Sequence, residues 1–190
     1  ADGLILLGYG DYLAYEGKLS KLMDQGTPFV RWGAVLPDQP GLSIGCDNVG
    51  GGYLAGAHLV STGRRRIAFL GDASSHYPEF LERYEGCSTA LREAGLASMD
   101  RVLQVDAISS EEAGEVAARE LLARNQPFDA LFAASDLIAI GAIRALTEAG
   151  LRVPDDVAIV GFDGTPIARF SNPPLTTVVQ DTSKAGELLV

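Results

Sequence analysis

The sequence predicts an α/β protein in which helices alternate with the strands of doubly wound, mostly parallel sheets. Short apolar runs, typical of buried strands, alternate with longer segments of helical periodicity. Glycines follow several of these longer segments, at the position where a helix commonly ends. Strands that alternate with helices in this way indicate parallel sheets joined by helical crossovers.

Each predicted element follows from a local pattern. The predicted strands are Leu4–Leu7, Phe29–Trp32, Ser43–Cys46, Ile67–Gly71, Val102–Val105, Ala130–Ala134, Val157–Gly161 and Thr176–Gln180. The helical segments between them carry apolar residues on one face. The predicted helices are Asp11–Gln25, Asn48 or Gly50 to Thr62, Glu79–Ala94, Ser110–Arg124, Leu137–Ala149 and Ser183–Val190.

The best defined unit is the strand–helix–strand segment Ala130–Asp163. Asp136 follows the first strand, and we expect it to cap the helix by accepting from its free N–H groups. Gly150 ends the helix, and Pro154 prevents its continuation. A right-handed crossover then brings Asp136 and Asp163 to the carboxyl ends of two parallel strands. Open α/β sheets bind their ligands at that edge, which is therefore the predicted site.

The composition indicates a globular chain that does not itself bind nucleic acid or membranes. The 190 residues are 47% hydrophobic and carry a formal net charge of −10, and no apolar run is long enough to span a bilayer. The one basic cluster, Arg64–Arg66, is expected to be a solvated loop, so the chain lacks the basic patch of a DNA-binding surface. Cys46 and Cys87 have no metal-ligand spacing, and no secretion signal precedes the first strand. We therefore expect reduced thiols and a cytoplasmic location.

Six motifs follow one another along the second half of the chain. They are Ser135-Asp136, Ala139-Ile140-Gly141-Ala142, Gly150, Val153-Pro154-Asp155-Asp156-Val157, Val160-Gly161-Phe162-Asp163 and Pro173-Pro174-Leu175-Thr176-Thr177-Val178. In this order and spacing they resemble the effector-binding domain of the lactose-repressor (LacI/GalR) family of bacterial transcription regulators. The resemblance implies a two-lobed, periplasmic-binding-protein-like fold in which each lobe is a doubly wound, mostly parallel sheet.

The resemblance also implies a division of the chain. Residues 1–62 resemble the second half of the N-terminal lobe, residues 63–175 the C-terminal lobe, and residues 176–190 a crossover strand and helix that return to the N-terminal lobe. Compared with the family pattern, the DNA-binding headpiece and the opening of the first lobe are absent from this sequence. An incomplete sheet exposes an apolar edge, so we expect altered or swapped packing of residues 1–62, such as completion by a second copy.

Arg83 and Asp136 are the main predicted ligand anchors. Arg83 lies near the start of a helix that follows a strand, and its five fixed donors suit sugar hydroxyls or a carboxylate. The resemblance implies an effector contact there, whereas the residues alone also allow a surface pair with Glu79 or Glu82. Asp136 carries a carboxylate that can accept from two neighbouring hydroxyls, and its alternative role is that of a helix cap alone.

The predicted walls of the site are residues that follow strand ends. They are Tyr9, Trp32, Tyr77 and Ser109. Trp32 is equally compatible with a core position. The family often has an aromatic residue in the place of Ser109, so Ser109 donates a hydroxyl there or Tyr77 takes over the stacking. Asp163 is expected to support the loop or the hinge between the lobes.

No catalytic residue, metal site or cofactor is predicted. No cluster of histidines, cysteines and carboxylates has metal-ligand spacing, and Gly50–Gly52 lacks the Lys-Ser/Thr of a phosphate loop. Phe162-Asp163-Gly164-Thr165 resembles the haloacid-dehalogenase motif, but Gly161 stands where that family has its nucleophile. The sequence therefore predicts a sensor and not an enzyme.

The resemblance implies a homodimeric sensor of a sugar or sugar-like effector. Operator DNA would be bound only through a headpiece absent from this sequence, and no membrane partner is expected. The alternative is a periplasmic sugar-binding protein of an ABC uptake system, which shares the two-lobed fold. The lack of a signal peptide and the segment Val153–Asp163 favour the regulator.

Overall fold

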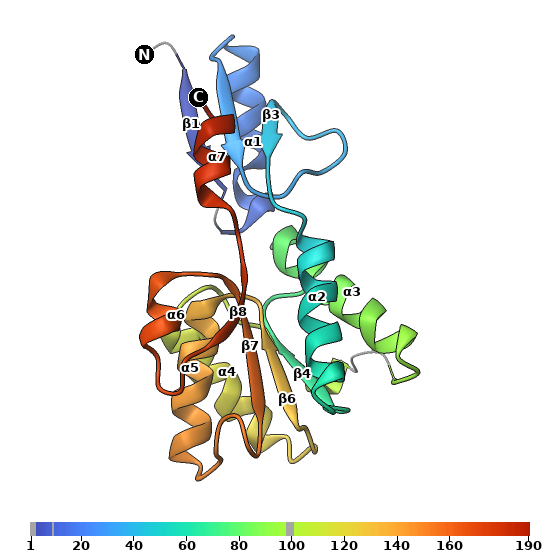
Figure 1. Ribbon diagram of the computed structural model, residues 1–190. Coiled ribbons are helices and arrows are strands. Elements are labelled where there is room, and N and C mark those ends of the chain that lie inside the picture. The colour runs from blue at the N-terminus through green and yellow to red at the C-terminus, as the bar shows by residue number, and fades with distance from the viewer. Residues whose placement is uncertain (1–2, 9, 98–100) are drawn as a thin grey trace.

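The chain forms two separate parallel sheets. The computed structural model describes residues 3–8, 10–97 and 101–190. Figure 1 shows the smaller sheet with helices α1 and α7 at one end of the molecule and the larger sheet with the remaining helices at the other end. The predicted α/β class with parallel sheets and two lobes is confirmed.

The smaller sheet is built from the first part of the chain. Its elements are β1 (Leu4–Leu7), α1 (Tyr12–Asp24), β2 (Phe29–Trp32) and β3 (Leu42–Ile44). The strands are parallel in the order β1-β2-β3, with Ile5 opposite Val30 and Arg31 opposite Ser43. β2 lies in the middle of this sheet, and the strands run with their carboxyl ends toward the larger lobe (Figure 1).

The larger sheet and its helices use most of the remaining chain. The elements that follow β3 are α2 (Asn48–Ser61), β4 (Ile67–Leu70), α3 (Pro78–Glu93), a short 3-10 helix (Arg101–Leu103), β5 (Gln104–Val105), α4 (Glu111–Ala123), β6 (Ala130–Ala133), α5 (Asp136–Glu148), β7 (Ala158–Asp163), α6 (Pro166–Phe170), β8 (Thr176–Val179) and α7 (Thr182–Leu188). The five strands are parallel in the order β5-β4-β6-β7-β8. The strand order reverses between β4 and β6, and such a switch point is where open α/β sheets bind ligands.

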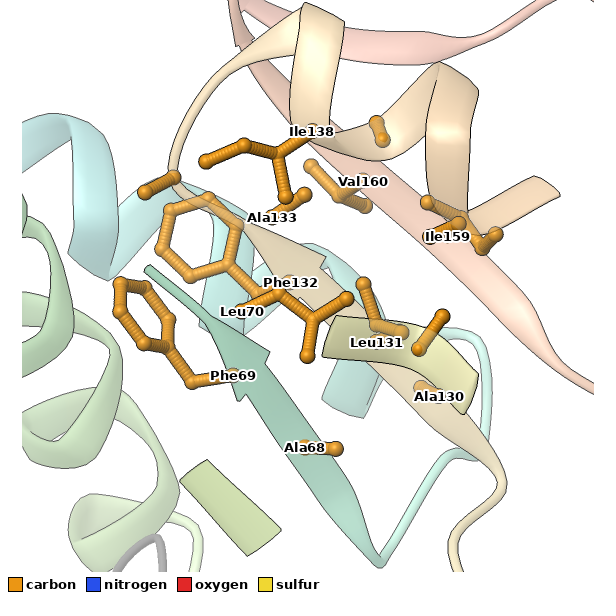
Figure 2. Packing of buried hydrophobic residues seen from close by; sticks show 14 of the residues in the cluster. Ala68, Phe69, Leu70, Ala130, Leu131, Phe132, Ala133, Ile138, Ile159 and Val160 are labelled. Carbon is orange, nitrogen blue, oxygen red and sulfur yellow. The ribbon is translucent and has the colours of Figure 1, made fainter. Parts of the chain in front are cut away.

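The core lies between the larger sheet and its two helical layers. β4 and β6 are buried at every position, as expected for parallel strands covered on both faces. Figure 2 shows Phe69 and Phe132 side by side on these strands, and their rings meet edge to face with centroids 5.5 Å apart. This rigid sheet fixes the strand ends from which the loops of the candidate site start.

Glycines allow the helices to pack closely in pairs, α2 against α3 and α4 against α5. A Cβ atom on Gly52 would lie 2.1 Å from the carbonyl oxygen of Arg83, and one on Gly141 would lie 1.9 Å from that of Glu111. Any larger residue would push the helices apart. Gly52 therefore serves helix packing and brings the backbone of Arg83 against α2.

Most predicted elements are confirmed to within two residues of their ends. The predicted strand Val102–Val105 is the least accurate, because its first half is a 3-10 turn and only Gln104–Val105 pairs with β4. The short helix α6 was not predicted, because five residues contain no periodic signal.

The division between the lobes remains a proposal. The sequence placed α2 with the first lobe, but in the structure α2 packs against α3 and also contacts β7. The strand β8 pairs with β7 in the larger sheet, and α7 lies at the end of the molecule that holds the smaller sheet. We therefore propose that the first lobe ends just before Asn48 and that the chain returns to it after β8.

Candidate functional site

A cavity of about 280 Å³ lies where the two lobes meet. It is bounded by residues at or after the carboxyl ends of β1, β5, β6 and β7, and by the end of the loop after β4 with the first turns of α3. These residues are Gly8, Gly10, Tyr77, Glu79, Phe80, Arg83, Ile108, Ser109, Ser135 and Asp163. The predicted edge of the sheet is therefore where the cavity is found.

Arg83 is the central cation of the cavity and is 4% exposed. Its Nε donates to Asn48 Oδ1 at 2.9 Å, and its Nη1 donates to the carbonyl oxygen of Ala134 at 2.5 Å. The guanidinium lies 3.7 Å from the ring centroid of Phe162 and 5.5 Å from that of Phe80. Arg83 is thus fixed from α2, β6 and β7, and it does not form the surface pair with Glu79 or Glu82 that the residues alone allowed.

Asp163 lies opposite Arg83 at the end of β7. Its Oδ1 is 3.5 Å from Arg83 Nη1 and accepts from Gln180 Nε2 at 2.5 Å. Burial raises the pKa of Asp163 to about 6, although Arg83 and the Gln180 hydrogen bond act in the opposite direction. Gln180 directly follows β8, so Asp163 joins the cavity to the segment that leads to α7. It lines the cavity, and its expected role as a support of the loop or hinge stays a prediction.

The walls of the cavity combine apolar faces with two hydroxyls. Tyr77 stacks on Phe80 with ring centroids 5.9 Å apart, and Ile108 contributes an aliphatic surface. Ser109 Oγ donates to Ser135 Oγ at 2.9 Å. Both Tyr77 and Ser109 therefore line the cavity, as the sequence predicts. The cavity thus contains both an aromatic ring for stacking and a serine hydroxyl for hydrogen bonding.

Asp136 does not line this cavity, and its predicted role as helix cap is wrong. Ser135 is the N-cap residue of α5 and accepts from Ile138 N, while Asp136 is the first helical residue. The Asp136 carboxylate is fully buried and accepts from Thr165 N (2.7 Å), Thr165 Oγ1 (2.8 Å) and Thr177 Oγ1 (2.5 Å). Because its side chain turns toward β8, it ties β8 and the loop after β7 to α5.

Trp32 does not line the main cavity but borders a hollow next to it. Trp32 is half-buried at the carboxyl end of β2, beside a much smaller hollow whose lining includes Glu79 and Arg83 of the main cavity. It is therefore neither a fully buried core residue nor part of the main cavity. Tyr9 lies outside the described residues.

Sequence reasoning missed Glu79, Phe80 and Ile108 as cavity residues. Glu79 was considered only as a surface partner of Arg83. The signal that finds it is spacing, because a residue four positions before Arg83 on the same helix shares its face. Ile108 lies in an irregular loop, where no periodic pattern indicates the direction of a side chain.

The described part of the chain shows no group of histidine, cysteine and carboxylate side chains arranged to hold a metal ion. Cys87 is buried, which raises the pKa of its thiol to about 12, and burial also raises the pKa of Cys46. Both thiols are therefore poor nucleophiles at neutral pH. Within the same residues, no helix has the length and apolarity needed to cross a membrane.

The chain is similar to a family of ligand-binding domains and to bacterial transcriptional regulators. A family model described as a periplasmic binding protein-like domain matches residues 57–190. The transcriptional regulator CelR of Thermobifida fusca is 38% identical over 188 residues, which are 97% of this chain and 54% of that protein. The regulator GalR of Escherichia coli is 34% identical over 178 residues, which are 91% of this chain and 51% of that protein.

Solved structures agree with these relatives. The complex of the transcriptional regulator CelR with cellobiose has a TM-score of 0.88 at 36% identity, with 100% of this chain and 57% of that chain covered. A regulatory protein of the LacI family from Chloroflexus aggregans has a TM-score of 0.85 at 28% identity, with 100% and 66% covered. The chain spans about half the length of the curated relatives it matches.

Proposed function

The chain belongs to the periplasmic binding protein-like domain family, in the branch of the LacI/GalR transcription regulators, and on this premise we propose that it senses a sugar or sugar-like effector. The effector would bind in the cavity between the lobes. The observation that carries the proposal is the meeting of Arg83, Asp163 and the Tyr77–Phe80 stack at the switch point of the sheet.

The chemistry of the cavity suits a carbohydrate. Sugars present hydroxyls around the ring edge and C–H groups on its faces, so they need polar groups and a flat apolar wall together. The hydroxyls of Ser109 and Ser135 and the charged groups of Arg83 and Asp163 supply the first, and the aromatic stack supplies the second. The CelR structure was solved with cellobiose, which supports this ligand class.

The proposed output is a change in the relative position of the lobes. A ligand that touches both lobes stabilises the arrangement in which both sets of contacts form. In a full-length regulator this would change the affinity of a paired DNA-binding segment for its operator, a coupling that is typically worth about 1–3 kcal/mol. With a net charge of −10, these residues would act through such a segment and not by gripping DNA themselves. The named relatives are all regulators, and none supports the uptake-system alternative.

A thermal-shift screen of the 190-residue chain tests the proposal. The panel contains glucose, galactose, ribose, cellobiose, lactose, sugar phosphates, sugar acids and purines. A ligand at a hundred times its dissociation constant should add about 2.7 kcal/mol of stability. Arg83→Lys is the paired variant, because it keeps the charge but loses the planar fork, and it should abolish the shift. Stabilisation by purines alone, or by no member of the panel, would refute a carbohydrate sensor.

A further inference from the structure

Glu79 belongs both to the cavity and to the contact between the lobes. It lies in the first turn of α3 and lines the cavity four residues before Arg83. Its Oε1 accepts from the backbone N–H of Ala34 at 2.7 Å, and Ala34 belongs to the loop after β2 in the first lobe. Ala34 is fully buried, so water does not compete readily for this hydrogen bond.

A buried cation lies on the other side of the same contact. Arg31 is 1% exposed, donates from Nη2 to the carbonyl oxygen of Ala34 at 2.5 Å, and donates from Nη1 to Tyr15 Oη at 3.1 Å. Among the residues that the structure describes, no carboxylate forms an ion pair with Arg31. The second lobe therefore offers a carboxylate to a region of the first lobe where a buried, hydrogen-bonded cation has no ion-pair partner among the described residues.

Gly33 lies between the two charges. A Cβ atom on Gly33 would be 3.0 Å from Glu79 Oε1 and 3.5 Å from Arg31 Cζ. Tyr15 of α1 is close to both groups: burial raises the pKa of Tyr15, Arg31 lowers it, and Glu79 raises it. Arg31, Ala34 and Glu79 thus form a continuous polar connection from the first lobe into the cavity.

We propose that Glu79 determines ligand specificity and couples the ligand to lobe closure, with Oε1 holding the Ala34 N–H and Oε2 accepting a hydrogen bond from a hydroxyl or ammonium group of the ligand. This proposal rests on the proposed function, because it assigns a role within the same cavity. Among the described residues, Oε2 has no hydrogen-bond partner of its own. One side chain then senses a ligand donor with one oxygen and holds the first lobe with the other.

The charge balance of the cavity extends the proposal to the class of ligand. The described lining contains two carboxylates, Glu79 and Asp163, and one cation, Arg83. The Nε and Nη1 atoms of that cation already donate to protein acceptors. A phosphate or carboxylate on the ligand would meet uncompensated negative charge, whereas a neutral polyol would supply the donors that the carboxylates need. Glu79 therefore selects neutral or amino sugars against sugar phosphates and sugar acids.

The lobe contact is tested first, by amide hydrogen exchange at Ala34 without added ligand. Glu79→Ala removes the acceptor and should speed exchange roughly tenfold or more, as expected for the loss of a hydrogen bond to a charged group. Glu79→Gln keeps an acceptor at this position and should restore most of the protection. Glu85→Gln is the matched control, since it makes the same change on an exposed position of the same helix. Unchanged exchange in Glu79→Ala would overturn the lobe contact.

Selectivity is tested by calorimetry with cellobiose and glucose against their acids, cellobionate and glucuronate. The wild-type chain should bind the neutral sugar of a pair and reject the acid. Glu79→Gln should weaken the neutral sugar, strengthen the acid, and change their affinity ratio by roughly tenfold, because one like charge has been removed. Equal ratios in the wild-type chain, Glu79→Gln and Glu85→Gln would overturn the selective role while leaving the carbohydrate sensor intact. If no chain binds any of the four compounds, the selective role fails together with the proposed function, and exchange at Ala34 separately decides the lobe contact.

Discussion

The two lobes use strands of similar apolar character, but they bury them to different degrees. β4 and β6 of the larger sheet are buried at every position. β1 of the smaller sheet reads Leu-Ile-Leu-Leu, yet three of its four residues are exposed and the fourth is intermediate. Helices cover both faces of the larger sheet, whereas β1 is an edge strand within the described residues. Apolar sequence therefore predicts a strand, while the elements packed around it decide its burial.

This difference matters for a two-lobed sensor. The larger lobe supplies most of the cavity lining from strand ends that a tightly packed sheet holds in place. The smaller lobe contributes Gly8 and Gly10 to the lining and the backbone of Ala34 to the contact with Glu79. A rigid binding surface paired with a less covered partner is an arrangement in which ligand contacts can change the lobe position. Whether a second copy completes the smaller lobe stays a prediction.

The largest expected effect contrasts the two sheets directly. Phe132→Ala removes a fully buried ring from the centre of the larger sheet and should lower the free energy of unfolding by about 3–5 kcal/mol. Ile5→Ala removes a side chain that is 54% exposed in β1 and should cost below about 1 kcal/mol. Urea titration monitored by circular dichroism measures both. Comparable losses would show that β1 is covered in solution, as completion by another copy requires.

The next effect concerns the carboxylate that the sequence assigned to the ligand. Asp136→Ala leaves three donors on Thr165 and Thr177 without their acceptor inside the larger lobe. We expect a loss of about 3 kcal/mol in the free energy of unfolding, because hydrogen bonds to a buried charged group are strong. Ser135→Ala is the control, because it removes the helix cap and the hydrogen bond from Ser109 but no charged group, and it should cost about 1 kcal/mol. If Asp136→Ala instead abolished ligand binding at unchanged stability, its side chain would have to face the ligand.

Ser135 and Asp136 also show how much of the structure can be predicted from the sequence. The order and type of the elements follow from apolar periodicity and glycine positions, and so does the edge of the sheet where the cavity lies. The role of Asp136 does not, because Ser135 and Asp136 are both good caps and a shift of one residue reverses which one enters the helix. A difference of one residue in the start of α5 therefore makes Ser135 the cap, while the carboxylate of Asp136 binds Thr165 and Thr177.

The same limit applies to the other site residues. Arg83 lies in the cavity because a strand end and the start of a helix together fix its position. Trp32 ends β2, but whether its ring reaches the cavity depends on how the two lobes meet, and no local pattern contains that information. Glu79 was overlooked for the same reason, since its partner Ala34 lies 45 residues away in the other lobe.

A third prediction tests the electrostatics at the junction of the lobes. Burial raises the pKa of Asp163 to about 6 from an ordinary value of 3.8, so its ionised form destabilises the fold. Two pKa units correspond to about 3 kcal/mol, a cost that is present above pH 6 and disappears as the pH falls toward 4. Asp163→Asn keeps an acceptor for Gln180 and should remove this pH dependence. The difference in unfolding free energy between variant and wild type should therefore shrink by roughly 2–3 kcal/mol from pH 7 to pH 4, and a constant difference would contradict the raised pKa.

The smallest effect is expected at the exposed contact between the lobes. His76 Nδ1 lies 2.8 Å from Asp11 Oδ1, and Tyr12 N donates to the carbonyl oxygen of His76 at 2.7 Å. The hydrogen bond from His76 lowers the pKa of Asp11, so this contact stabilises the fold above the ordinary pKa of an aspartate and is lost as the pH falls through the lowered value. Because both side chains are solvated, His76→Ala should leave urea unfolding nearly unchanged. It should instead speed amide exchange at Tyr12, because the side-chain contact with Asp11 helps to hold the His76 carbonyl against Tyr12 N. This increase should be smaller than the one that Glu79→Ala causes at Ala34, since the contact of Glu79 with the buried Ala34 N–H holds the lobes more firmly than the exposed contact. The reverse order would place the main connection between the lobes at the mouth of the cavity and not within it.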